Sequence, residues 1–158
     1  MNPDNNTKPE VADVSVSRAR EAKLEAALAS LPRVPLVSVK PTPLEPLPRL
    51  SELLGGPPLY VKRDDLTGCE LSGNKVRKLE YLLAAAQARG CTAVITCGGI
   101  QSNHARATAF SARKLGMEPH LMLRESDLGA RSTVDGNLLL DAIIGARIRW
   151  VTPDGYRD

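Results

Sequence analysis

The chain has 158 residues, of which 42% are hydrophobic, so it has room for one domain with a real core and is too apolar for a disordered protein. Its 21 basic and 18 acidic residues are scattered along the chain, and aromatic residues make up only 3%, which argues against a nucleic-acid surface. Three cysteines without C-x-x-C spacing argue against both a zinc site and a disulfide framework.

The first sixteen residues are mostly polar and lack the apolar stretch of a secretory signal, and no later stretch approaches the length of a membrane span. We therefore expect a soluble, cytoplasmic protein with no membrane partner. From Ser17 to Ser30 the leucines fall on one helical face, until Pro32 stops the pattern. Residues 1–30 are thus predicted to form a polar tail and a peripheral N-terminal helix.

Residues 32–48 contain six prolines, which force an extended path. A short amphipathic helix is predicted over residues 47–54, where two glycines end it. Residues 59–63 have the pattern of a strand, which leads into a loop through Gly68. The adjacent basic and acidic residues at positions 62–65 indicate structural pairing or a solvated edge more than a binding site.

The chain from Asn74 to about Arg89 has the pattern of a long helix, which Gly90 ends. Its predicted apolar face consists of Leu79, Leu82, Leu83 and Ala86. Lys75 and Lys78 project from neighbouring points on its first turn. A helix N-terminus favours anions and disfavours an ammonium group, so Lys75 is a candidate nucleophile beside an anion site. The alternative is that both lysines are solvated surface residues.

Strand and helix alternate through the rest of the chain. Strands are predicted at residues 93–97, 118–123 and 146–151, and helices at 102–115 and 133–144. The strand at 93–97 is apolar enough to be a parallel strand that is buried on both faces. The alternation predicts βαβ units and an α/β fold with a parallel sheet and flanking helices.

The loop after the strand at 93–97 is a candidate binding loop, because ligands of parallel sheets bind beyond the carboxyl ends of the strands. Gly98 and Gly99 are predicted to turn the chain into a helix that starts near Ser102, Asn103 and His104. The loop lacks the G-x-G-x-x-G and G-x-x-x-x-G-K-[ST] patterns, which makes NAD or ATP a poor second choice.

A hydrolase built on Ser102 and His104 is also weakly supported, because the chain has only one other histidine and no G-x-S-x-G elbow. For His104 alone, a polar residue at a helix N-terminus without any chemistry remains an open alternative.

Five motifs in order resemble the D-cysteine desulfhydrase and 1-aminocyclopropane-1-carboxylate (ACC) deaminase family of pyridoxal-phosphate (PLP) enzymes, within the tryptophan synthase β-like fold (fold type II). The motifs are Leu31-Pro32-Arg33, Pro41-Thr42-Pro43-Leu44, Val61-Lys62-Arg63-Asp64-Asp65, Gly73-Asn74-Lys75-Val76-Arg77-Lys78-Leu79-Glu80 and Gly98-Gly99-Ile100-Gln101-Ser102-Asn103-His104. Together they are far more specific than any one of them.

The resemblance implies that Lys75 carries PLP and moves protons at the substrate carbon, and that Lys78 lies close to the cofactor phosphate. It implies that Ser102, Asn103 and His104 form a loop that faces the substrate carboxylate and the cofactor ring. Asn103 would hydrogen-bond the phenolic oxygen of PLP, while Ser102 would bind the carboxylate or assist proton transfer.

The implied activity is that of a lyase or deaminase on a small amino acid. D-cysteine would give pyruvate, ammonia and hydrogen sulfide, and the forms Gln101-Ser102-Asn103-His104 and Pro43-Leu44-Glu45 favour this desulfhydrase branch. ACC deamination is the alternative within the family. A non-catalytic chain that keeps the fold and binds a partner or an anion is the alternative outside it.

Family members are roughly twice this length. The resemblance therefore implies that residues 31–74 are the opening segment of the larger PLP domain, that residues 75–158 are most of the smaller α/β domain, and that the C-terminal half of the family is absent, so that the fold is truncated. A homodimer is expected at full length.

Overall fold

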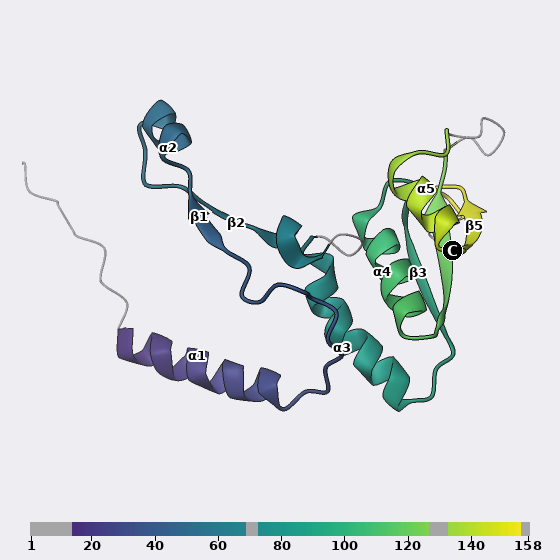
Figure 1. The fold of residues 1–158 in the computed structure, drawn as a ribbon, viewed down its shortest axis with the longest axis horizontal. Coiled ribbons are helices and arrows are strands. Elements are labelled where there is room, and N and C mark those ends of the chain that lie inside the picture. Colours follow the sequence, from purple (N-terminus) through teal and green to yellow (C-terminus); the bar gives the residue numbers. More distant parts are fainter. Residues whose placement is uncertain (1–13, 69–72, 127–132, 156–158) are drawn as a thin grey trace, which may run out of the picture. The chain divides into compact units, whose positions relative to one another are not determined.

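A parallel sheet of three strands organises the larger part of the chain. In the computed structural model, which describes residues 14–68, 73–126 and 133–155, the strands β3 (Ala93–Gly99), β4 (Glu118–Arg124) and β5 (Arg147–Val151) lie in the order β3-β4-β5 (Figure 1). Both strand pairs are parallel, with Ile95 opposite His120 and His120 opposite Arg147. The prediction of βαβ units on a parallel sheet is confirmed.

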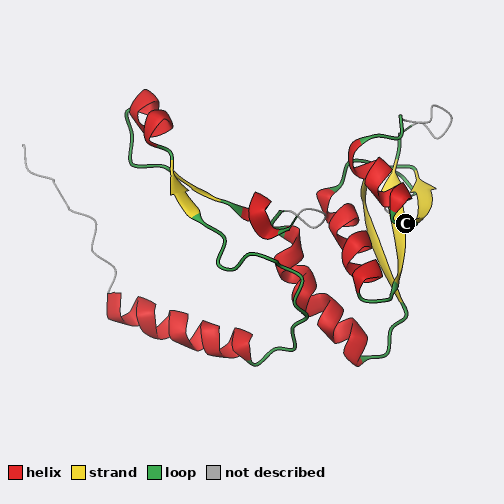
Figure 2. Cartoon of the chain, in the orientation of Figure 1, coloured by secondary structure: helices red, strands yellow, loops and turns green. Residues whose placement is uncertain are grey.

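Helices precede this sheet and connect its strands (Figure 2). Helix α3 (Lys75–Ala88) precedes β3, α4 (Asn103–Lys114) connects β3 to β4, and α5 (Gly136–Ile143) connects β4 to β5. Helix α4 packs against β3 and β4, and α3 and α5 both pack against α4. Since βαβ crossovers are right-handed and the strands are added in one direction, both crossover helices come to lie on the same face of the sheet.

Two expectations for the strand β3 are therefore wrong. Ile95 is 71% exposed, so among the described residues this strand is covered on one face and not on both. The glycine pair does not turn the chain either, because Gly98 and Gly99 continue the strand opposite Leu123 and Arg124. The turn lies after them, at residues 100–101.

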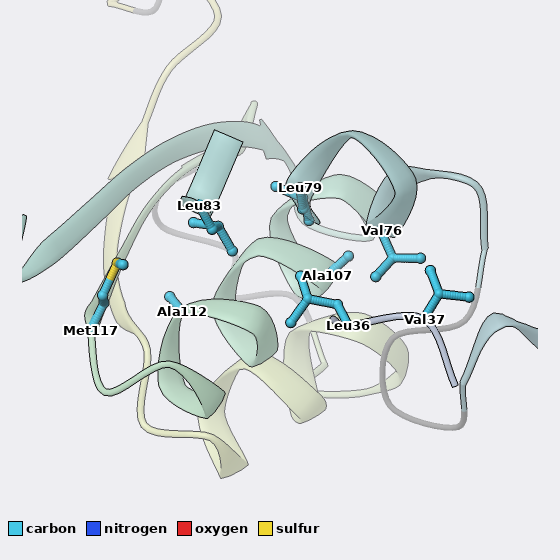
Figure 3. Packing of buried hydrophobic residues seen from close by; sticks show 8 residues of the cluster. All are labelled: Leu36, Val37, Val76, Leu79, Leu83, Ala107, Ala112 and Met117. Atoms are coloured by element: carbon cyan, nitrogen blue, oxygen red, sulfur yellow. The ribbon is translucent and has the colours of Figure 1, made fainter. Parts of the chain in front are cut away.

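The main core lies where α3 meets α4 (Figure 3). The segment before β1, helices α3 and α4, and the turn after α4 each contribute buried apolar side chains. They are Leu36, Val37, Val76, Leu79, Leu83, Ala107, Ala112 and Met117. The alanines of α4 have short side chains, which lets α3 and the sheet approach it closely. A second cluster joins α4, β4 and α5 through Ala105, Ala109, Leu121, Leu123 and Leu138.

The buried face of α3 differs from the predicted one. Leu79 and Leu83 are each 2% exposed, as expected, but Leu82 is 58% exposed. The reason is Glu80, which is fully buried although it is charged. The inner stripe of α3 is therefore centred between Leu79 and Glu80, which turns Leu82 outward.

The remaining elements precede α3. By its contacts the chain divides into two units, Met1–Pro32 and Arg33–Asp158. Helix α1 (Val14–Ala29) belongs to the first unit, and most of the predicted polar tail, residues 1–13, lies outside the described residues.

In the second unit, β1 (Leu44–Pro46) pairs antiparallel with β2 (Tyr60–Lys62). Helix α2 (Pro48–Leu54) connects these two strands, and the short 3-10 helix η1 (Asp64–Thr67) follows β2. None of the helices in the described part of the chain is both long and apolar enough to cross a membrane.

Candidate active site

Lys75 is the first residue of α3, as the sequence predicts. The turn before it is held by Gly73, whose φ of 106° lies in the region that favours glycine. The Gly73 N–H donates to the hydroxyl of Thr67 at 2.9 Å and to the carbonyl of Asp64 at 2.8 Å. Thr67 is fully buried, so this contact fixes where α3 begins.

An ion pair ties the first turn of α3 to η1. Arg77 donates to the Asp64 carboxylate at 2.6 and 3.1 Å, and the Thr42 hydroxyl donates to it at 2.9 Å. The Arg77 hydrogen bond holds the pKa of Asp64 at about 2, well below its usual range. Arg63 forms two more ion pairs, one with Asp65 and one with Glu45, each at 2.8 Å. Arg63, Asp64 and Asp65 therefore take part in structural ion pairs, as the sequence indicates, whereas Lys62 donates to the Thr42 hydroxyl at 2.5 Å.

Glu80 anchors the segment before β1 to α3. Its carboxylate accepts the backbone N–H groups of Leu36 and Val37, each at 2.9 Å, and the Lys40 ammonium at 2.7 Å. Arg33 donates to the other carboxylate oxygen, with its Nε at 2.6 Å. Burial alone raises the pKa of Glu80, but the hydrogen bonds outweigh it and lower the pKa to about 2. The carboxylate is thus charged inside the core.

Ser102 caps α4, because its Oγ accepts a hydrogen bond from the Ala105 N–H at 3.1 Å. Gly98 lies directly beneath it, and a Cβ added to Gly98 would be 2.6 Å from the Ser102 Cβ and Oγ. A residue without a side chain is needed at Gly98 for this cap to form. Asn103 follows as the first residue of α4 and is exposed.

His104 brings the two candidate motifs together. Burial is the main cause that lowers its pKa, and the positive charges of Lys78 and Lys75 lower it further. The first turns of α3 and α4 are therefore close enough for their side chains to interact. The Nδ1 atom of His104 is buried and has no hydrogen-bond partner among the described residues. Burial and the two lysine charges therefore both disfavour the charged imidazolium, and one ring nitrogen is buried without a partner among the described residues.

A pocket of about 500 Å³ lies at this junction. Its described lining residues are Lys62, Asp64, Asp65, Gly73, Asn74, Asn103 and Arg106. The N-terminal ends of α3 and α4 both contribute to it, and helix N-termini present unpaired N–H groups that favour anions. Lys75 follows the lining residue Asn74, although its own side chain is not among the described lining. Of the predicted site residues, Asn103 is among the described lining, while Lys75 and Ser102 are the sequence neighbours of the lining residues Asn74 and Asn103.

Arg106 also lines the pocket, although the sequence pattern did not indicate it. It is 6% exposed and lines the pocket one turn after Asn103, on the same side of α4. Behind it, burial raises the pKa of Asp141 to about 6, while the Arg106 charge partly opposes the rise. An arginine within the run Ala105-Arg106-Ala107, at the start of a buried helix, is the sequence signal that would have found it.

Comparisons with known proteins identify the family and the fold. Residues 36–158 match the family described as pyridoxal-phosphate dependent enzyme. The chain is 54% identical over 120 residues to a putative ACC deaminase of Thermotoga maritima, and 45% identical over 124 residues to a D-cysteine desulfhydrase of Salmonella paratyphi B. These alignments cover 76% and 77% of this chain.

A crystal structure described as an ACC deaminase homologue superposes with a TM-score of 0.76 at 43% identity, over 85% of this chain and 40% of that one. The chain spans 37% of the length of each of the two curated relatives. Its mixed α/β architecture with a parallel sheet is that of the fold type II PLP enzymes. The matched residues, the superposition and the identities show that this chain belongs to the family of pyridoxal-phosphate dependent enzymes.

Proposed function

We propose that this chain supplies the cofactor lysine and the substrate-facing loop of a PLP-dependent lyase that acts on a small amino acid. The observation that carries the proposal is the meeting of two helix starts at one pocket. The charges of Lys75 and Lys78 act on His104, while Asn74 and Asn103 line the pocket between them. This arrangement supports a site in which a lysine amine, an amide and an anion-favouring field would act on one ligand.

The described residues fit PLP in three respects. The cofactor phosphate is an anion, and the ends of α3 and α4 favour anions. The lysines of the first turn of α3 supply positive charge beside it. The buried, unsatisfied Nδ1 of His104 and the exposed amide of Asn103 offer polar partners for the cofactor and its substrate. When bound, PLP supplies an electron sink for the bonds that break at the α carbon of an amino acid.

Four residues then have separate roles in binding and proton transfer. Lys75 would hold the cofactor through its amine, and the same amine would take or return a proton at the substrate α carbon. The Ser102 Oγ accepts from the Ala105 N–H, so its hydroxyl proton can be donated to the substrate carboxylate. Lys78 balances the phosphate charge. Burial lowers the pKa of His104 and so favours its neutral imidazole, which could accept a proton at one ring nitrogen or donate one from the other.

We propose D-cysteine as the first substrate to test. It would react with water to give pyruvate, ammonia and hydrogen sulfide, and the loop form Gln101-Ser102-Asn103-His104 supports this branch. ACC is the second candidate, because a relative that is 54% identical carries the name of a putative ACC deaminase. Its ring opening with water would give a four-carbon oxo acid and ammonia. The products therefore separate the two substrates.

The test uses the native protein that contains this chain, purified with PLP and supplied with D-cysteine, L-cysteine or ACC. Sulfide and oxo acid are measured for wild type, for Lys75→Ala and for the matched control Lys23→Ala on the exposed surface of α1. We expect one substrate to be consumed and Lys75→Ala to lower turnover by about 1000-fold or more, with the control unchanged. Turnover that survives in Lys75→Ala, or PLP binding without turnover of any amino acid, would contradict the proposal.

A further inference from the structure

Asn103 is held from one side by Asn137, which lies on α5. The Asn137 Nδ2 donates to the Asn103 Oδ1 at 2.9 Å and to the Gln101 carbonyl at 2.9 Å. In return, the Asn137 backbone N–H donates to the Gln101 Oε1 at 2.8 Å. The start of α5 and the loop after β3 are therefore joined by three hydrogen bonds, which involve the side-chain amides of Gln101, Asn103 and Asn137.

The orientation of every amide in this junction follows from backbone groups, whose roles are fixed. A backbone N–H can only donate, so Gln101 must turn its Oε1 toward Asn137. A backbone carbonyl can only accept, so Asn137 must turn its Nδ2 toward Gln101. That same NH₂ group then meets the side chain of Asn103, which has to present its oxygen.

The contact with Asn137 decides which atom of the Asn103 amide remains available at the pocket. With its Oδ1 occupied by Asn137, Asn103 has its Nδ2 left as a donor, and this nitrogen hydrogen-bonds none of the described residues. Asn103 lines the pocket between the two helix starts. We propose that Asn137 is a positioning residue that fixes the Asn103 amide with its NH₂ toward the pocket, where it selects an anionic oxygen of the bound cofactor. This inference rests on the proposed function, because it takes PLP as the ligand.

Close packing supports the rigidity that such positioning needs. Gly136 begins α5 with φ of 50°, and a Cβ there would be 2.6 Å from the Gln101 Oε1. A larger residue at this point would push the loop away from α5. The Gln101 Nε2 also donates to the Asp135 Oδ1 at 2.9 Å, which adds a bond to the junction without touching Asn103.

The experiment compares Asn137→Asp, Asn137→Ala, Asn103→Ala and the double variant Asn103→Ala/Asn137→Ala in the native protein that contains this chain. Two quantities are measured with PLP itself, the absorption spectrum of the bound cofactor and its Kd. An aspartate at position 137 accepts and cannot donate, so the Asn103 amide is expected to invert and turn its oxygen toward the pocket. Asp135→Ala is the matched control, because it removes a bond from the same junction and leaves the Asn103 contact in place.

We expect Asn137→Asp and Asn103→Ala to shift the spectrum in the same direction and to raise the Kd for PLP roughly tenfold, equivalent to about 1.4 kcal/mol. Asn137→Ala should have a smaller effect of the same sign, because the amide can then adopt either orientation. In the double variant the loss should be no greater than in Asn103→Ala alone, since Asn137 acts through Asn103. The control should keep the wild-type spectrum.

Additive effects of Asn103→Ala and Asn137→Ala would overturn the inference, because a purely structural residue acts independently of Asn103. So would an Asp135→Ala spectrum that is shifted as far as that of Asn137→Asp. Failure of the wild-type protein to bind PLP at all would instead overturn the proposed function. Spectral shifts with Asn103→Ala but not with either Asn137 variant would overturn this inference and leave the proposed function standing.

Discussion

Replacing Glu80 by glutamine tests how α3, the helix that begins with Lys75, is held against the segment before β1. The Glu80 carboxylate is fully buried in α3 and accepts hydrogen bonds from two backbone N–H groups, from Lys40 and from Arg33. Glutamine keeps one acceptor oxygen but replaces the other with an NH₂ group, which would face the two cations. The substitution therefore removes the charge without removing the volume.

The lowered pKa of Glu80 gives the size of the expected loss in unfolding free energy. Its fall from the ordinary value of 4.5 to about 2 corresponds to about 3 kcal/mol in favour of the folded state. This agrees with the cost of about 3–5 kcal/mol for removing one partner of a buried pair. Since the folded pKa lies below the unfolded one, the contribution is fully present above pH 4.5 and is lost as the pH falls toward 2.

Hydrogen exchange of the Leu36 and Val37 amides measures the loss of stability at this segment, because both amides donate to Glu80. At pH 7 we expect Glu80→Gln to speed their exchange on the order of 100-fold and to lower the unfolding free energy by about 3 kcal/mol. Glu52→Gln on the exposed face of α2 is the matched control and should change neither. A variant within about 0.5 kcal/mol of wild type at pH 7, or a difference that persists at pH 2, would show that the Glu80 charge does not hold this segment to α3.

Three further outcomes follow from the site. Ser102→Ala should lower turnover more than PLP affinity, whereas Asn103→Ala should change the absorption of bound PLP; equal, small effects of both would place the loop away from the substrate. Gly98→Ala should displace the Ser102 cap, which would lower stability by about 1 kcal/mol and also weaken substrate binding. Gly99→Ala should be tolerated, because a Cβ there meets no atom within 4 Å. Equal stability of the two variants in urea unfolding would show that Gly98 does not constrain Ser102. Burial raises the pKa of Asp141 to about 6, so the unfolding free energy of the wild type should fall by about 3 kcal/mol as the pH rises from 4 to above 6. Asp141→Asn should lack this pH dependence. If the variant keeps it, another group is responsible.

Local signals in the sequence were sufficient to predict both helix starts. The Gly73-Asn74 turn and the Ser102 cap are short-range features, and the structure puts Lys75 and Asn103 at the first positions of α3 and α4. The alternation of strand and helix likewise predicted a parallel sheet, because each βαβ unit carries its own periodicity. These features depend on neighbours within one or two turns.

The features that the sequence did not predict depend on distant partners. Glu80 appears as a polar residue beside the apolar stripe of α3, and its burial becomes explicable only when Arg33 and Lys40 are brought against it. Asn137 lies 34 residues from Asn103, in a segment with no local signal of a binding role. The strand β3 was expected to be buried on both faces because its residues are apolar, but composition cannot say on which side the crossover helices pack.

We have proposed that Lys75, at the start of α3, holds the cofactor. Borohydride reduction of the native protein with bound PLP, followed by peptide mapping, identifies the lysine that carries the cofactor, because reduction fixes PLP to that residue. We expect the modified peptide to carry PLP on Lys75 and Lys75→Ala to yield no modified peptide. Modification of Lys78 instead, or of any lysine outside the first turn of α3, would show that Lys75 is not the cofactor lysine.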